Sequence, residues 1–500
     1  MPFQNRPLDI PEIRYRVGLL LDRHDQAVCS RVSKDWSETF TPLLYTSVDL
    51  RSTYTEVGGE QDEGLWETNA PSMTSVHSNC RRIRQLTVHV KEIRDEDEEW
   101  GLFHGLNGDD NNDQRIYPVK YTWLRDFLAD CPNLQRLVLR GFRRHPSLVA
   151  ELVKRCPELR DLSLIESTFN IKEIAILLTT HCKKVEAVTI TDGQHSGEEY
   201  GQKLKMPKLF PNIKFLDLQR FFTHADLTLF WVERCPALEE LRIEERLNRY
   251  HSVDGFSVLR KCPKLARLEI RNLETAGDEL ATILNFCPEL THLTLRGVGF
   301  NQEVYKALRK RHFPTLRVLN LFDAFGMKSW MCGPILALCP NLVEFGLPEM
   351  EVDSIVPAEV ITTGAPDRKK RLTMAESSVA VTNGPWACKG LTTLKAASIK
   401  WSTTAQNDAF FNRLAQLEQL EEFLIGGLDD PSESKDAIAR RSEFVSVGAR
   451  RRVDPGPLVL GELDLKQIQS IQRLTSTWPK LRNYRYLHKP PKMDRSFLLF

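Results

Sequence analysis

Cysteine is the residue type in this chain with the widest range of possible chemistry, because a thiolate can bind a metal, attack a substrate or form a disulfide. The sequence contains eleven cysteines, none of them spaced as Cys-x-x-Cys, and Cys332 and Cys339 have no histidine at ligand spacing. This pattern predicts no metal site. Nine cysteines recur at one position of a repeated motif, namely Cys80, Cys131, Cys156, Cys182, Cys235, Cys262, Cys287, Cys339 and Cys388. We interpret them as packed structural thiols, which indicates a reducing compartment.

Catalytic motifs do not occur in the sequence. It has no Gly-x-Ser-x-Gly, His-Glu-x-x-His, Walker loop or Gly-x-Gly-x-x-Gly stretch, and a lone histidine such as His181 is more often a helix-end residue than a catalyst. We therefore expect no enzyme, no catalytic residue and no cofactor. The 68 basic residues balance the 67 acidic ones, which excludes a global basic field for nucleic acid or an anionic membrane, although local patches remain possible.

The recurring cysteines belong to a repeat unit. Residues 131–139 read CPNLQRLVL, and copies or variants of this motif start at 131, 156, 182, 210, 235, 262, 287, 313 and 339, in steps of 25 to 28 residues. This period, together with the Leu-x-x-Leu-x-Leu spacing, is typical of leucine-rich repeats. Within a unit, alternating leucines predict a half-buried strand, and helical spacing follows, as at Ile171, Ile174 and Leu177 after Asn170, a predicted N-cap.

The predicted fold class is therefore α/β. We expect a curved leucine-rich repeat solenoid over residues 80–487, built from strand-turn-helix units of about 26 residues, after a small all-α three-helix module at 7–50 and a connector at 51–79. Insertions near 91–122, 351–387 and 429–457 interrupt the repeats, and residues 488–500 form a C-terminal tail. The first insertion is acidic and turn-rich, so it is either a solvated loop or a docking arm for a basic partner.

Two basic runs and the N-terminus bear on localisation. The runs at 367–371 and 450–452 are either nuclear localisation signals or solvated loop charge. The first seven residues do not form a signal peptide, and no apolar run reaches the roughly 20 residues of a membrane span. We expect an intracellular protein, cytoplasmic or nuclear or both, with no membrane partner.

Stacked parallel strands place their outward residues in columns. The first column reads Arg136, Asp161, Ala187, Phe215, Glu240, Arg267, His292, Val318; the second Val138, Ser163, Thr189, Asp217, Arg242, Glu269, Thr294, Asn320; the third Arg140, Ile165, Thr191, Gln219, Glu244, Arg271, Arg296, Phe322. Opposite charges at 240–244 and 267–271 predict a cross-strand ladder of ion pairs. Arg296, predicted beside Phe322, is the arginine expected to lack an acidic neighbour. Because aromatic and arginine side chains are typical interface anchors, the predicted substrate-binding residues are Phe215, His292, Arg296 and Phe322.

Residues 8–50 do not fit the repeat. A helix with Pro11 near its start has apolar positions at Ile13, Val17, Leu20 and Leu21, a polar break follows at 22–25, and further short helices are expected up to about residue 50. The segment resembles an F-box in the elements Ile10–Ile13, the stripe Val17/Leu20/Leu21, the loop Asp25–Gln26, Val32–Trp36 and Leu44–Tyr45. Gln26, Ser33 and Tyr45 stand where the family pattern has Leu, Cys and Trp.

The resemblance to F-box proteins with leucine-rich repeats implies a function. Such proteins look like substrate-recognition subunits of SCF-type cullin-RING ubiquitin ligases, in which the F-box docks on a Skp-family adaptor and the repeats bind the protein to be ubiquitinated. The implied adaptor-binding residues here are Ile10, Pro11, Ile13, Val17, Leu20 and Leu21, with Trp36 in the core of the module. The alternative is a non-enzymatic protein-binding scaffold whose N-terminal helices cap the solenoid.

Overall fold

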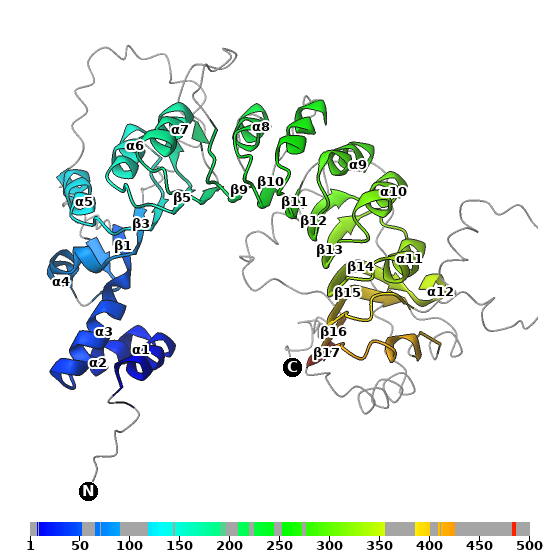
Figure 1. The fold of residues 1–500 in the computed structure, drawn as a ribbon, viewed down its shortest axis with the longest axis horizontal. Coiled ribbons are helices and arrows are strands. Elements are labelled where there is room, and N and C mark those ends of the chain that lie inside the picture. Colours follow the sequence, from blue (N-terminus) through cyan, green and yellow to red (C-terminus); the bar gives the residue numbers. More distant parts are fainter. Residues whose placement is uncertain are drawn as a thin grey trace, which may run out of the picture. The chain divides into compact units, whose positions relative to one another are not determined.

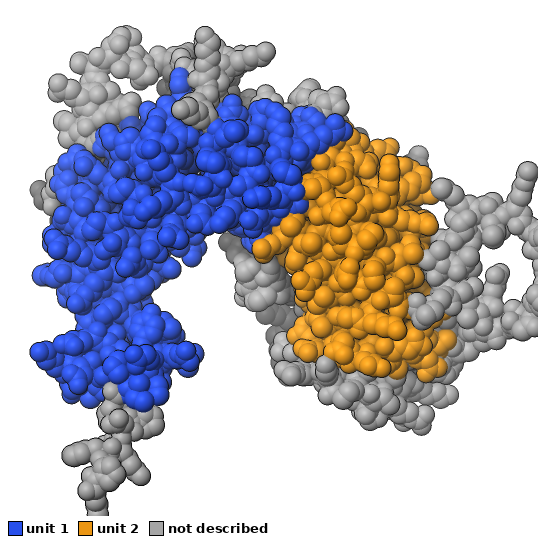
Figure 2. Space-filling view, viewed as in Figure 1, with its two compact units in different colours: residues 1–247, 254–265 blue, residues 248–253, 266–500 orange. Residues whose placement is uncertain are grey.

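The computed structural model describes most of the chain. The described residues are 8, 10–52, 66–70, 72–90, 119–143, 146–191, 194–195, 209–219, 225–244, 253–272, 277–355, 386–400, 409–410, 412–425 and 483–486. They divide into two compact units: unit 1 comprises residues 1–247 and 254–265, and unit 2 comprises residues 248–253 and 266–500 (Figure 2). Most of the predicted insertions 91–122, 351–387 and 429–457, both basic runs and the tail 488–500 lie outside the described residues.

Three helices come first in the chain, and strands and helices are then interspersed (Figure 1). The α-helices are α1 (Pro11–Leu20), α2 (Arg23–Cys29), α3 (Lys34–Thr46), α4 (Met73–Ser78), α5 (Val119–Ala129), α6 (Pro146–Lys154), α7 (Ile171–Thr180), α8 (Ala225–Glu233), α9 (Gly277–Phe286), α10 (Gln302–Arg311), α11 (Cys332–Leu338) and α12 (Val352–Ile355). Short 3-10 helices are η2 (Cys80–Arg82), η5 (Val253–Lys261) and η6 (Ser329–Met331).

The strands are short. They are β1 (Ser47–Ser52), β2 (Trp66–Thr68), β3 (Gln85–Val90), β4 (Arg136–Arg140), β5 (Asp161–Ile165), β6 (Thr168–Phe169), β7 (Ala187–Thr191), β8 (Gln194–His195), β9 (Phe215–Gln219), β10 (Glu240–Glu244), β11 (Arg267–Arg271), β12 (His292–Gly299), β13 (Val318–Phe325), β14 (Glu344–Glu351), β15 (Thr393–Lys400), β16 (Glu422–Ile425) and β17 (Asn483–Tyr486).

Parallel pairing joins the strands in chain order within each unit. In unit 1 the order is β10-β9-β7-β5-β4-β3-β1-β2, and β2 alone in this series runs antiparallel to its neighbour. In unit 2 the order is β17-β16-β15-β14-β13-β12-β11. Helices lie along one face of the strands (Figure 1), and the packed pairs include α6 with α7 and α9 with α10. The mixed α/β fold with a long parallel sheet is as predicted.

The leucines of the repeated motif build the core. Leu134, Leu137 and Leu139 are all fully buried, and β4 and β7 alternate buried and partly exposed residues with the period of two that a strand with one buried face requires. Asn170 caps α7, as predicted, by accepting hydrogen bonds from the N–H groups of Lys172 and Glu173. The regular spacing of apolar residues thus translates directly into packed strand-helix units.

The repeated cysteines are free thiols, and all of them are buried apart from the half-buried Cys80. The Sγ of Cys182 donates to the carbonyl oxygens of Val153 (3.4 Å) and Cys156 (3.5 Å), so the thiol ties one strand-helix unit to the one before it. Burial raises the pKa of Cys182 to about 11 and that of Cys131 to about 12. At neutral pH these thiols are protonated packing groups, as the sequence predicts.

The sheet begins earlier in the chain than residue 80. Strand β1 starts directly after α3 and pairs in parallel with β3, from Ser47 opposite Gln85 to Ser52 opposite Val90. The predicted connector 51–79 therefore contains the end of β1, all of β2 and the helix α4. Val48 and Leu50 are fully buried. Their alternation with polar residues indicates a strand, although no cysteine of the repeated motif precedes it.

Candidate binding surfaces

Helices α1, α2 and α3 form the predicted three-helix module. Pro11 opens α1, and the side chain of Asp22 accepts a hydrogen bond from the N–H of Asp25 to cap α2. The predicted polar break at 22–25 is thus the N-terminus of the second helix. Ser33 caps α3 in the same way, accepting from the N–H of Trp36, and the ring of Trp36 stacks on that of Phe40 with centroids 5.4 Å apart.

Helix α1 packs through a polar and a small residue instead of through its apolar ones. Arg14 and Gly18, one turn apart, are its buried residues. A Cβ at Gly18 would lie 2.9 Å from Cε1 of Phe40, so the missing side chain is what allows α3 to approach. The apolar residues of α1 consequently face away from the module's interior.

The predicted adaptor-binding residues lie on this outer side to different degrees. Leu20 is 87% exposed, Ile10 and Ile13 are also exposed, Pro11 is exposed, and Val17 and Leu21 are half-buried. Further apolar side chains exposed on the module are Leu8, Tyr15, Leu19, Val28 and Val32. Apolar residues this numerous on so small a domain are typical of a surface that binds a partner.

Gln26 was predicted in a loop and lies instead inside α2, almost fully buried. Its Nε2 donates to the carbonyl oxygens of Gly18 (2.8 Å) and Leu21 (3.1 Å). Gly18 lies in the last turn of α1 and Leu21 is its C-cap, where few backbone acceptors are satisfied within the helix. The carbonyl of Gly18 also accepts from the N–H of Leu21. Gln26 therefore caps α1, and the Asp22 cap four residues earlier is the sequence signal that could have placed it in a helix.

The outward strand residues form the predicted columns within each unit. In unit 1 the register aligns Arg136 with Asp161, Asp161 with Ala187 and Ala187 with Phe215. In unit 2 it aligns Arg267 with His292 and His292 with Val318. The charge ladder between 240–244 and 267–271 stays a prediction, because residues 240–244 belong to unit 1 and residues 267–271 belong to unit 2.

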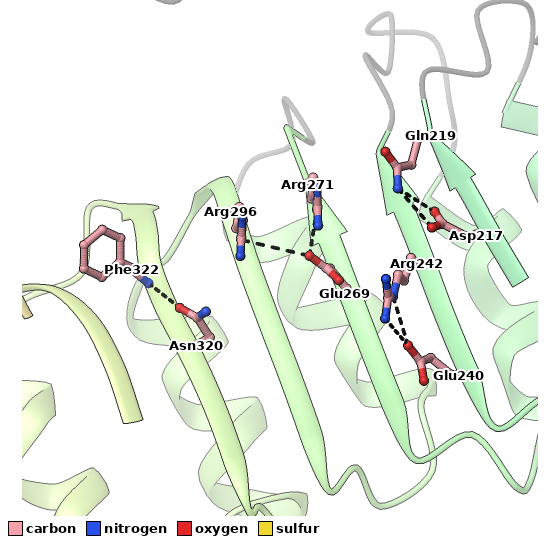
Figure 3. A network of polar contacts seen from close by, with 9 residues as sticks. All are labelled: Asp217, Gln219, Glu240, Arg242, Glu269, Arg271, Arg296, Asn320 and Phe322. Carbon is pink, nitrogen blue, oxygen red and sulfur yellow. Dashed lines mark hydrogen bonds and ion pairs between the residues drawn. The ribbon is translucent and has the colours of Figure 1, made fainter. Parts of the chain in front are cut away.

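Charges on the strand face of unit 1 are paired with one another (Figure 3). Nη2 of Arg242 lies 2.7 Å from Oε1 of Glu240 on the same strand. The guanidinium of Arg242 also lies 5.1 Å from the ring centroid of Phe215, so this predicted substrate residue is half-buried beneath an arginine. A ligand reaching Phe215 would compete with a cation–π contact.

Glu166, which follows β5, satisfies two further arginines. Its two carboxylate oxygens are each 3.0 Å from an arginine Nη2, one of Arg140 and one of Arg143. Its backbone is left-handed, with φ of 49°, a conformation that few residues other than glycine adopt. Burial acts to raise the pKa of Glu166, but the hydrogen bonds and charges of the two arginines outweigh it and lower that pKa.

Unit 2 brings together the other three predicted substrate-binding residues, on the adjacent strands β12 and β13 (Figure 3 shows two of them). His292, Arg296 and Phe322 are all half-buried. The Nδ1 of His292 lies 2.8 Å from Oγ1 of Thr291. Phe215 is separate from this group, because it belongs to unit 1.

Arg296 has acidic neighbours, contrary to the prediction. Its Nε lies 4.0 Å from Oε1 of Glu269, an oxygen that is also 2.7 Å from Nε of Arg271. On the other side the register places Asp323 opposite Arg296, where Phe322 was predicted. An arginine between two acids is a weaker candidate for binding an acidic ligand than an isolated one.

The one-residue shift has a local cause. Oδ1 of Asn320 accepts a hydrogen bond of 3.1 Å from the N–H of Phe322, and the pairing of β12 with β13 becomes irregular just beyond Thr294 opposite Asn320. A side chain that takes a backbone donor in this way creates a bulge and re-aims the residues after it. Alternation of apolar and polar residues cannot predict such a bulge. Asparagine is disfavoured inside strands, however, and so indicates a possible irregularity.

Among the described residues, no helix combines the length and apolarity that crossing a membrane requires. Nor do those residues contain a cluster of three or more histidine, cysteine or acidic side chains arranged to hold a metal ion. Comparison with known proteins gives no assignment, since no family model and no curated protein matches the chain.

Proposed function

We propose that this protein is the substrate-recognition subunit of an SCF-type cullin-RING ubiquitin ligase. Its three-helix module would be an F-box that docks on a Skp-family adaptor, and its strand-helix units would be leucine-rich repeats that bind the protein to be ubiquitinated. The observation that carries the proposal is the exposed apolar side of α1 and α2 around Leu20, Ile13 and Val28.

The energetics of burial support the docking role of this surface. Leaving a leucine-sized side chain in water forgoes roughly 1.5–3 kcal/mol relative to burying it. Helix α1 exposes Ile13, Leu19 and Leu20 while it buries Arg14, so a partner that covers the apolar side would gain most of that free energy. An adaptor with its own apolar groove is the kind of partner that fits.

No catalytic residue of this chain is needed under the proposal. In a ligase of this type, the cullin-bound RING protein and its E2 partner carry the chemistry. The receptor contributes by holding the substrate so that a lysine comes close to the E2 thioester, which converts an encounter between separate molecules into a reaction within one complex. What this chain must supply is two binding surfaces in a fixed relation.

The adaptor surface can be tested by co-purifying the full chain with a Skp-family adaptor. We expect the wild type to bind and the Ile13→Asp/Leu20→Asp variant to lose binding, since both residues are exposed and each aspartate would have to be desolvated. Lys34→Asp is the matched control: it changes the charge by the same amount at an exposed position of the same module, in the first turn of α3. Circular dichroism checks that all variants stay folded.

The possible outcomes separate the candidate functions. Loss of adaptor binding in the α1 variant with retention in Lys34→Asp would support the ligase receptor. Failure of the wild type to bind would reject it. It would favour a scaffold in which the module only caps the stack, a role consistent with the direct continuation of α3 into β1 and the burial of Leu44 and Tyr45 at that junction.

The strand face around Arg296 and Phe322 is the proposed substrate surface in unit 2. Alanine at both positions should reduce the proteins captured from a cell extract by the full chain, whereas Thr294→Ala, a smaller change on the same strand face, should leave capture unchanged. Equal capture by all three would remove Arg296 and Phe322 from the proposed surface.

A further inference from the structure

The loops that lead into β3, β4, β5, β7, β9 and β10, together with residues 260–265, form one continuous edge of unit 1. We define the strand-start edge as the segments 78–84, 129–135, 154–160, 180–186, 209–214, 233–239 and 260–265. Backbone hydrogen bonds connect neighbouring segments. The N–H of Gln135 donates to the carbonyl oxygen of Arg84, that of Arg160 to the carbonyl of Gln135, and that of Glu186 to the carbonyl of Arg160. Side chains add to this, since Nδ2 of Asn133 donates to the carbonyl of Arg81.

This edge is strongly basic. Its acidic residues are Asp130, Glu158, Glu186, Glu233 and Glu239. Its basic residues are Arg81, Arg82, Arg84, Lys154, Arg155, Arg160, Lys183, Lys184, Lys214, Arg234, Arg260, Lys261 and Lys264. Thirteen against five is an excess of eight positive charges, whereas the whole chain has an excess of one, 68 against 67. These segments therefore carry a local excess of positive charge that acidic residues elsewhere in the chain offset.

Part of this charge is neutralised within the edge. Lys184 binds Glu158 (2.6 Å), Lys214 binds Glu186 (2.9 Å) and Lys261 binds Glu233 (2.6 Å). Six exposed side chains make no hydrogen bond or ion pair with the part of the chain that the structure describes: Arg81, Arg84, Lys154, Arg155, Lys183 and Lys264. These open charges distinguish the edge from the strand face, where arginines already have acidic partners.

The composition of the edge favours a protein partner over a nucleic acid. Within its described segments no phenylalanine, tyrosine or tryptophan is exposed, so the edge lacks the stacking platform that single-stranded nucleic acids use. Glutamates stand between the basic residues and would repel a continuous phosphate backbone, whereas a polypeptide can place acidic residues only where they fit. Seven segments at strand spacing span about 29 Å, the length of roughly nine extended residues.

From these observations we infer that the strand-start edge of unit 1 docks an acidic segment of a partner protein. The contacts would run from Arg84 and Arg155 to Lys183 along adjoining loops. The inference rests on the proposed function in one respect, that the partner would then be the substrate. The edge begins where the module ends, because the N–H of Arg84 donates to the carbonyl of Thr46, the last residue of α3.

Fluorescence anisotropy of a labelled, glutamate-rich peptide of about twelve residues, titrated with the full chain, tests the inference. We expect binding that weakens with salt, and a loss of about tenfold or more in the Arg84→Ser/Arg155→Ser/Lys183→Ser variant. The variant Lys310→Ser/Arg317→Ser/Lys389→Ser removes the same charge from exposed positions of unit 2 and should change affinity less than about threefold.

Three results would overturn the inference. They are no binding of the peptide by the wild type, equal losses in the two triple variants, and tighter binding of a single-stranded oligothymidine of equal charge with the same dependence on Arg84, Arg155 and Lys183. The adaptor is titrated against the same variants. Retained adaptor binding beside lost peptide binding would support the inference. Absence of adaptor binding with peptide binding intact would reject the ligase proposal and leave standing the docking of an acidic segment on the basic strand-start edge.

Discussion

The three-helix module and the strand-helix units differ in how completely they bury their apolar residues. In the strand-helix units, leucines of the repeated motif such as Leu137 and Leu293 are fully buried, and most described charged residues are at least partly exposed. In the module, Arg14 and Gln26 are buried while Leu20 is 87% exposed. The difference teaches that apolar content alone does not define a core. The strand-helix units bury most of their apolar residues internally, whereas helix α1 of the module leaves several of its own exposed.

The largest test of this contrast is the same substitution made in both regions. Leu293→Ala in β12 should lower the free energy of unfolding of unit 2 by about 3 kcal/mol, because it opens a cavity in a packed interior. Leu20→Ala in α1 should change stability by less than about 0.5 kcal/mol. Thermal unfolding of the full chain followed by circular dichroism measures both, and comparable losses would refute the contrast.

A buried histidine offers a second test within unit 2. His312 is fully buried, its Nδ1 accepts from the N–H of Leu290 (3.2 Å), and its Nε2 lies 3.1 Å from the carbonyl oxygen of Leu284. Burial lowers the pKa of His312 from 6.5 to about 4, so the unfolded chain takes up the proton first as pH falls. The contribution of neutral His312 to the free energy of unfolding is therefore intact above about pH 6.5. It is lost progressively down to about pH 4, by roughly 3 kcal/mol.

The matched variant for this prediction is His312→Asn. It should be less stable than the wild type at pH 7, because it loses at least one of the two backbone hydrogen bonds, and should show a shallower decline in unfolding free energy between pH 6.5 and pH 4. Denaturant titrations at several pH values measure the decline. Parallel curves for the two proteins would show that His312 does not titrate with unfolding.

Gln26 is the corresponding buried polar residue of the module. Gln26→Leu should destabilise the module by about 1–3 kcal/mol, because the carbonyls of Gly18 and Leu21 lose the side-chain donor of Gln26, and only that of Gly18 keeps a backbone donor. Hydrogen exchange should show faster exchange in α1 and α2 and unchanged exchange in β12 and β13. Faster exchange in those strands as well would mean that the module and unit 2 do not unfold separately.

The smallest expected effect is on the strand face. Glu269→Gln removes the partner that Arg271 and Arg296 share, and such partly exposed ion pairs contribute at most about 1 kcal/mol each. We expect unit 2 to lose less than about 1 kcal/mol of stability. A loss as large as that of Leu293→Ala would show that the outward charges stabilise the sheet as much as its core does.

The predictable part of the molecule is the part in which spacing determines contact. A step of 25 to 28 residues and alternating leucines sufficed to place the strands and to align residues such as Asp161 and Ala187. The alignment failed at Arg296, because one hydrogen bond from Phe322 to Asn320 shifts the register. Gln26 was misplaced for a related reason, since a polar side chain that caps a neighbouring helix has no periodic signature.

The junction between the module and unit 1 has a mechanical consequence. Helix α3 ends at Thr46 and strand β1 begins at Ser47, with no residue between them, and the carbonyl of Thr46 is held by Arg84 from the first parallel neighbour of β1. A joint of this kind has no hinge. A partner bound to the module would therefore also fix the orientation of the sheet of unit 1. A few glycines inserted between Thr46 and Ser47 would make this junction a flexible linker.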